Sequence, residues 1–170
     1  MGDSSDPATQ STSPATPLDL SSTLQTSTSI SLSWSASVVQ SGGAAVTGYK
    51  VYKDDAVHEY EGSATTADMT VDPGTLYEFA VSAVSAAGEG EKSSELSQSS
   101  APGAPAALTS TLQTATSISL SWTAPSSDSA SGDDATRYRV YDSSSAVLYD
   151  GEDTEYTPVS YTHLTLPTKA

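Results

Sequence analysis

The stretch STLQTSTSISLSW at residues 22–34 decides the fold, because apolar and hydroxyl side chains alternate along its second half. Ile30, Leu32 and Trp34 fall on one parity, and the serines between them fall on the other. A period of two residues predicts a β-strand with one face in a core and the other in water. A nearly identical stretch, STLQTATSISLSW, follows at residues 110–122, so the sequence predicts the same strand twice.

Two further stretches of the first copy have the same period. Within GYKVYK, Tyr49 and Val51 share one face, and within LYEFAVSAV, Tyr77 and Phe79 do so. Turn signals rich in Gly and Pro separate these stretches. Short strands between frequent turns predict an antiparallel β-sandwich or barrel.

The repeat extends beyond the first quoted stretch. RYRVY at 137–141 echoes GYKVY at 48–52, and YDGE at 149–152 echoes YEGS at 60–63. A period of 88 or 89 residues is too long for a solenoid and suits a small independent domain. The stretch SSAPGAPAA at 99–107 predicts a stiff, Pro-containing joint between the copies.

Taken together, these residues resemble the fibronectin type III family. Trp34 matches the early-strand tryptophan of the family, and VDPGTLY resembles its tyrosine-corner motif, with Val71 in place of Leu and Tyr77 as the corner tyrosine. The resemblance implies an all-β, immunoglobulin-like antiparallel β-sandwich, as two modules in tandem of which the second is incomplete. It also implies that the Tyr77 hydroxyl bonds the backbone a few residues upstream.

We expect four segments along the chain: a disordered linker at 1–16, a first module at 17–100, the N-terminal part of a second module at 101–158, and a non-native tail at 159–170. The linker is rich in Ser, Thr and Pro, so it buries too little apolar surface to offset chain entropy. The tail contains VSYTHLTLPT, which resembles the translation of a transposase adapter used in short-read sequencing. The alternative is a genuine divergent ending.

The composition excludes several classes of function. Six Lys and Arg against 21 Asp and Glu give a net charge of −15, without the basic clusters that nucleic acids or anionic membranes require. No apolar run reaches the roughly 18 residues of a membrane span, so we expect no direct membrane insertion. The absence of cysteine excludes disulfides, thiol chemistry and the usual structural zinc sites.

The candidate structural residues are large apolar side chains at core parity. Leu24 belongs to the expected core of the first module. The principal expected core residues of both modules are Trp34, Tyr49, Val51, Tyr77, Phe79, Trp122, Tyr138 and Val140.

A candidate aromatic ligand face consists of Tyr52 and Tyr60, with Tyr141 and Tyr149 as their counterparts, although tyrosine is also an ordinary strand residue. We expect no catalytic residue and no cofactor, and His58 is interpreted as an exposed strand residue. The acidic stretches of the second copy lack the spacing of a calcium loop, so no metal site is expected.

These observations favour non-catalytic binding or spacer modules of a larger extracellular or cell-surface protein, of the adhesion type, with a protein partner that the sequence does not name. The integrin-binding tripeptide Arg-Gly-Asp does not occur in the chain. One alternative is a spacer appended to a secreted hydrolase, and another is an intracellular scaffold. The fold alone does not decide among them, because function depends on sites and not on the fold that carries them.

Overall fold

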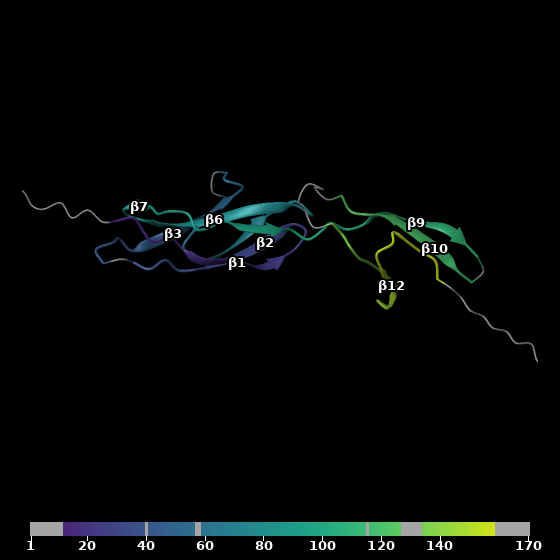
Figure 1. Ribbon diagram of the computed structural model, residues 1–170. Helices are drawn as coiled ribbons and strands as arrows, with labels where there is room; N and C mark the ends of the chain where they lie inside the picture. The colour runs from purple at the N-terminus through teal and green to yellow at the C-terminus, as the bar shows by residue number, and fades with distance from the viewer. Residues whose placement is uncertain (1–11, 40, 57–58, 115, 127–133, 159–170) are drawn as a thin grey trace, which may run out of the picture. The chain divides into compact units, whose positions relative to one another are not determined.

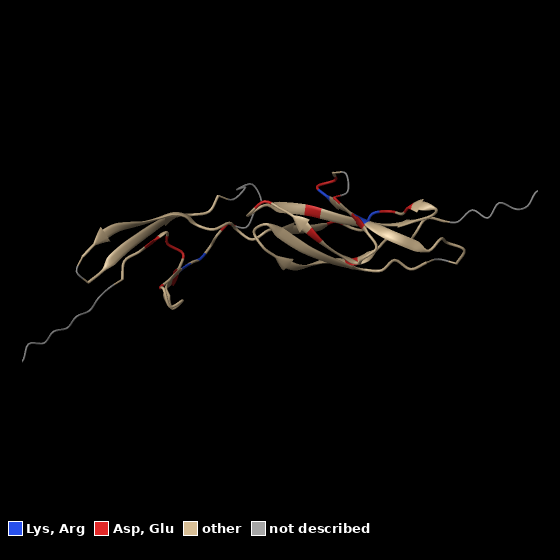
Figure 2. Cartoon of the chain, turned by 180° about the vertical axis from the view of Figure 1, so that it is seen from behind, with Lys and Arg blue, Asp and Glu red and all other residues tan. Residues whose placement is uncertain are grey.

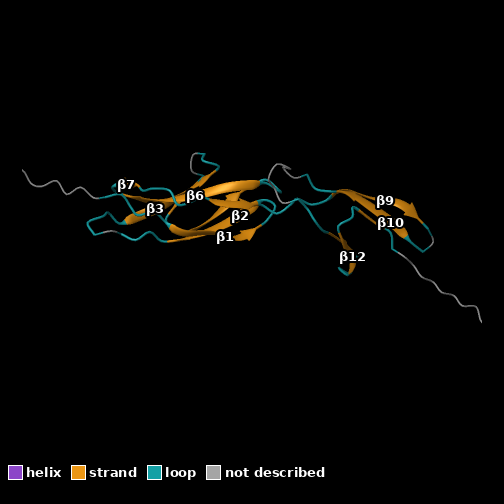
Figure 3. Ribbon diagram, in the orientation of Figure 1, coloured by secondary structure: helices purple, strands orange, loops and turns teal. Residues whose placement is uncertain are grey.

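The computed structural model describes residues 12–39, 41–56, 59–114, 116–126 and 134–158. Every regular element among these residues is a β-strand (Figure 3). They form two compact units, one that ends at Pro102 and one made of Gly103–Ser126 with the described residues from Asp134 onward (Figure 1). His58 and the tail expected at 159–170 lie outside the described residues.

The first unit is a sandwich of two antiparallel sheets. One sheet has the order β1-β2-β5, with bounds Leu18–Gln25, Ser29–Ser35 and Thr66–Thr70. The other has the order β4-β3-β6, and β7 and β8 both pair with β6. Its strands are β3 (Val46–Lys53), β4 (Tyr60–Gly62), β6 (Leu76–Ser85), β7 (Gly88–Glu89) and β8 (Leu96–Ser99). The expected immunoglobulin-like sandwich is confirmed.

The core of the first unit lies between these sheets. Trp34 packs edge-on against Tyr49 with ring centroids 5.6 Å apart, and Phe79 is fully buried. Such aromatic side chains bury about 150–250 Å² each, so they dominate the packing between the sheets. The expected core residues that are buried here are Trp34, Tyr49, Val51, Tyr77 and Phe79.

Leu24 differs from the expectation, since it is 57% exposed. The pairing of β1 with β2 shifts register between Ser22 and Leu24. An extra residue at such a bulge turns the following side chains to the opposite face of the sheet. Leu20, which precedes the shift, packs against the core.

The tyrosine corner has the geometry that the resemblance implied. The backbone N–H of Asp72 donates a hydrogen bond of 2.8 Å to the Tyr77 hydroxyl. The Tyr77 ring itself is buried, so the bond fixes the chain where it crosses from β5 to β6.

The chain packs into the first unit before residue 17. Pro14 and Pro17 are both buried, and a Cβ at Gly90 would collide with the Pro14 backbone. Proline has no N–H that burial would leave unpaired, which suits it to this position. The expected linker at 1–16 therefore reaches into residues that belong structurally to the first unit.

The second unit repeats the first five strands of the first. These strands are β9 (Ala106–Gln113), β10 (Ile118–Thr123), β11 (Tyr138–Tyr141), β12 (Val147–Gly151) and β13 (Glu155–Tyr156). They form the sheets β13-β10-β9 and β11-β12, which correspond to β5-β2-β1 and β3-β4. Trp122 and Tyr138 are buried and Val140 is half-buried.

Candidate functional site

A group of hydrogen-bonded polar side chains lies on the outer face of the sheet that contains β3 and β6. Lys50 and Tyr52 come from β3, Ser82 from β6 and Glu89 from β7. We call these four residues the Glu89 cluster. Lys50 and Ser82 stand opposite each other in the β3–β6 pairing, and strand alternation turns both away from the core.

Glu89 accepts hydrogen bonds from the other three members of the cluster. Its Oε1 accepts from the Ser82 hydroxyl at 2.6 Å and from the Tyr52 hydroxyl, and its Oε2 lies 3.1 Å from Lys50 Nζ. The hydrogen bond from Ser82, then that from Tyr52, lowers the pKa of Glu89 from 4.5 to about 2. Glu89 is therefore ionised at neutral pH and unsuited to act as a general base.

Lys92 covers one side of this cluster. Its Nζ lies 4.0 Å from the centroid of the Tyr52 ring and 3.2 Å from a carboxylate oxygen of Asp55. A cation over the ring face takes the position in which a flat ligand would stack. Tyr52 is thus engaged at both its hydroxyl and its ring.

Tyr60 lies on the other face of the sheet from Tyr52. It pairs with Val51, so it points to the core side, and its ring is 6.3 Å from that of Trp34. The phenol lies over Gly62, where an added Cβ would overlap the Tyr60 hydroxyl. The single ligand face of Tyr52 and Tyr60 suggested by the sequence is wrong, because the β3–β4 register places the two side chains on opposite faces.

The second unit repeats this separation. Tyr149 pairs with Val140, lies 5.9 Å from Trp122 and covers Gly151 in the same manner. Tyr141, the counterpart of Tyr52, is 53% exposed. In both units, therefore, one tyrosine supports the tryptophan and the other belongs to the outer face.

Sequence reasoning did not find the Glu89 cluster. Ser82 sits at outward parity in β6 and Glu89 in the hairpin that follows, but neither position is distinctive without the β3 register. Among the residues that the structure describes, the acidic positions are spread over both units with few basic ones between them (Figure 2). Within the described ranges, no three His, Cys, Asp or Glu side chains gather as a metal site would require. The cluster ties β7 to β3 and β6, which is a structural role.

Among the residues that the structure describes, no helix is long and apolar enough to cross a membrane.

Comparison with known proteins extends this description. Chitinase A1 of Niallia circulans is 35% identical over 128 residues, which cover 69% of this chain and 18% of that protein. Exoglucanase B of Cellulomonas fimi is 30% identical over 131 residues, covering 71% and 12%. The chain thus spans less than a fifth of the length of these two relatives.

The fold comparison agrees with the sandwich described above. The fourth fibronectin type III domain of a human protein, solved in solution, superposes with a TM-score of 0.50 at 20% identity, covering 60% of this chain and 91% of that domain. Residues 15–99 match the fibronectin type III domain family, which is half of the chain. With its two-sheet sandwich, its corner tyrosine and this match, the chain belongs to the fibronectin type III family.

Proposed function

We propose that the chain is a non-catalytic spacer within a polysaccharide-degrading hydrolase. The observation that carries the proposal is the length of the likeness to Chitinase A1 and Exoglucanase B. It covers 69% and 71% of this chain, whereas the family match covers only residues 15–99, half of the chain. The likeness therefore runs past the first unit into the joint and the second unit.

The physical character of the chain supports a spacer. The Glu89 cluster and the tyrosine corner use their polar groups to hold strands together, as a stiff module requires. The stretch between β8 and β9, residues 100–105, contains two prolines, which restrict backbone rotation there. A net charge of −15 keeps such a surface soluble.

The names of the relatives favour this hypothesis over cell adhesion. A chitinase and an exoglucanase act on polymers too large to enter a cell, so a spacer of such an enzyme would work outside the cell. The extracellular location remains part of the proposal.

The reading frame around this sequence tests the proposal directly. We expect a glycoside hydrolase domain in the same frame as residues 17–158. A frame that instead encodes a membrane span with further adhesion-type modules would contradict the proposal.

A binding assay separates a spacer from a carbohydrate-binding module. The purified chain is mixed with insoluble chitin or cellulose and centrifuged, and we expect it to stay in the supernatant. In the full-length enzyme, deletion of 17–158 should slow hydrolysis of the insoluble polymer and leave hydrolysis of a soluble oligosaccharide unchanged. Retention of the isolated chain on the polymer would overturn the spacer hypothesis.

A further inference from the structure

The tyrosine corner contains an Asp–Pro peptide bond, between Asp72 and Pro73. The corner lies between β5 and β6, and both residues are exposed to water. An Asp–Pro bond breaks in acid more readily than other peptide bonds, because the carboxyl group can attack the adjoining carbonyl carbon and the proline nitrogen is a good leaving group. The contacts around this bond therefore affect its chemistry.

The backbone of Asp72 is held at both of its polar groups. Its N–H donates to the Tyr77 hydroxyl at 2.8 Å, and its carbonyl oxygen accepts a hydrogen bond of 2.6 Å from the Ser100 hydroxyl. Ser100 is 0% exposed, and its Oγ accepts in turn from the Thr75 N–H at 3.0 Å. The donor is thus fixed in direction and shielded from water, so it polarises the Asp72 carbonyl more strongly than a water molecule would.

The side chain of Asp72 is free to move by comparison. Within the described ranges of the chain, no hydrogen bond or ion pair engages its carboxylate. The carboxylate of Asp68, by contrast, accepts from the Ser31 hydroxyl at 2.6 Å. The Asp72 carboxylate can therefore rotate towards its own carbonyl carbon while the backbone stays in place, which reduces the entropy lost on attack.

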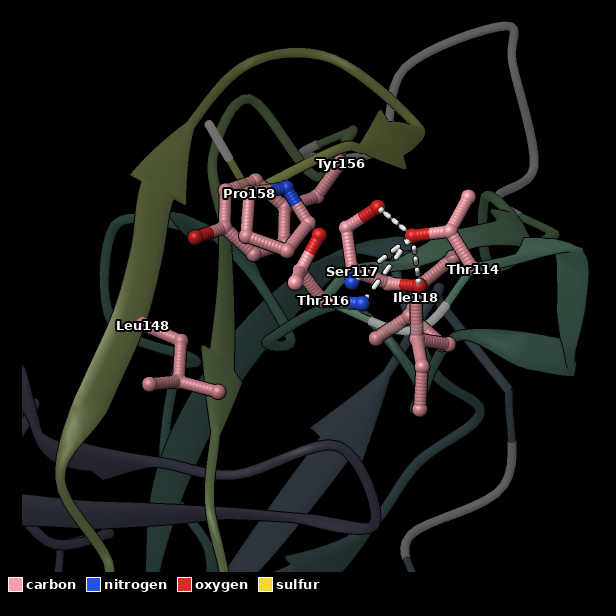
Figure 4. A pocket seen from close by; sticks show the side chains of 8 residues that line it. Thr114, Thr116, Ser117, Ile118, Leu148, Tyr156 and Pro158 are labelled. Atoms are coloured by element: carbon pink, nitrogen blue, oxygen red, sulfur yellow. Dashed lines mark hydrogen bonds between the residues drawn. The ribbon is translucent and has the colours of Figure 1, made fainter. Parts of the chain in front are cut away.

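A hydroxyl that donates to a backbone carbonyl is not unusual by itself. In the turn before β10, the Thr114 hydroxyl bonds the Ser117 carbonyl at 3.3 Å (Figure 4). That bond is longer and exposed, and an isoleucine follows the carbonyl in place of a proline. At the corner, a short buried hydrogen bond and an Asp–Pro linkage occur at the same carbonyl.

We propose that the bond between Asp72 and Pro73 is a self-cleavage site that acts in acid. A carboxyl oxygen of Asp72 attacks the carbonyl carbon of the same residue, and the Ser100 hydroxyl stabilises the negative charge that develops on the carbonyl oxygen. The carboxyl proton passes to the Pro73 nitrogen, the C–N bond breaks, and a cyclic anhydride forms at Asp72. Water then opens the anhydride to the side-chain carboxyl and a new C-terminal carboxyl. One water molecule is consumed, and the products are residues 1–72 and 73–170.

The two products stay together while the first unit is folded. Trp34 belongs to one product and Phe79 to the other, and both lie in the same core cluster. Cleavage therefore replaces a covalent connection by packing alone, and the products separate only when the unit unfolds. This proposal does not depend on the proposed spacer function.

Timed incubation of the full chain in acid tests the proposal. The pH is the lowest at which the near-ultraviolet circular dichroism of the chain is unchanged, and mass spectrometry under denaturing conditions measures the products. The bond between Asp6 and Pro7 is an internal reference of the same chemistry. We expect the bond after Asp72 to break at least about tenfold faster than the bond after Asp6. The ratio of the two rates should fall towards one in concentrated urea.

Three variants separate the chemistry from the fold. Asp72→Asn removes the attacking carboxyl and should abolish cleavage after residue 72, while the bond after Asp6 still breaks. Ser100→Ala should slow cleavage of the folded chain by at least about tenfold and leave the rate in urea unchanged. Ser97→Ala is the matched control, since Ser97 is an exposed serine of β8, and it should leave both rates unchanged.

Three outcomes would overturn the proposal. Equal rates after Asp6 and Asp72 in the folded chain would show that the corner adds nothing to the chemistry of the bond. An unchanged rate of folded Ser100→Ala would leave Ser100 with a structural role alone. Release of residues 73–170 from Asp72→Asn would show that the carboxyl is not the attacking group.

Discussion

Tyr77→Phe isolates the contribution of the corner hydrogen bond to the stability of the first unit. The substitution keeps the buried ring and removes only the hydroxyl that accepts the 2.8 Å bond from the Asp72 N–H. A net intramolecular hydrogen bond contributes about 0.5–1.5 kcal/mol, and a buried donor left unpaired costs about 1–3 kcal/mol. Because the Asp72 residue is exposed, water can reach its N–H, so we expect a loss of about 1 kcal/mol.

The assay is thermal unfolding of the full chain carrying Trp122→Phe, so that fluorescence reports Trp34 alone. A loss of about 1 kcal/mol lowers the Tm of a domain of this size by about 4–8 °C. Tyr49→Phe is the matched control, since that hydroxyl accepts a longer bond of 3.2 Å from the Ser37 N–H, and it should cost less. If Tyr77→Phe left the midpoint unchanged, or cost as much as Tyr77→Ala, the hydroxyl would not have the role assigned to it.

Three further predictions concern the first unit. Trp34→Ala should cost about 3–5 kcal/mol by removal of a core aromatic side chain, measured by urea unfolding; a loss below about 1 kcal/mol would contradict the packing. Gly62→Ala should lower the free energy of unfolding by about 1–3 kcal/mol, because the added methyl group displaces the Tyr60 ring. In a Tyr60→Ala background the same change should cost little, and an equal cost in both backgrounds would refute this contact. The pKa of Glu89 is depressed from 4.5 to about 2. The stability that its ionised carboxylate contributes to the first unit is therefore full above pH 4.5 and is lost as the pH falls towards 2. Glu89→Gln should therefore lower the Tm by an amount that shrinks across this interval, and a difference in Tm independent of pH would be evidence against the cluster.

Local alternation was sufficient to predict the strands that build the core. Ile30, Leu32 and Trp34 alternate with serine over an uninterrupted stretch, and the buried positions of β2 follow that alternation. Leu24 was misplaced because a bulge reverses parity within a strand without a distinctive residue to announce it.

Features that depend on pairing between strands could not be predicted from the sequence pattern. Tyr52 and Tyr60 look alike in sequence, but the β3–β4 register places them on opposite faces. The Glu89 cluster joins residues up to 39 positions apart, and only the β3–β6 and β6–β7 registers bring them together.

The near identity of β2 and β10 has a consequence for how the chain reaches its fold. Ser29–Ser35 reads SISLSWS and residues 117–123 read SISLSWT, so β10 can compete with β2 for the place between β1 and β5 with every inward side chain matched. During synthesis the N-terminal unit emerges from the ribosome and folds first, before β10 has left the ribosome, so the competitor arrives too late. A chain diluted out of denaturant offers both strands at once, and we expect it to refold with a slow, strand-exchanged population that the newly synthesised protein never forms.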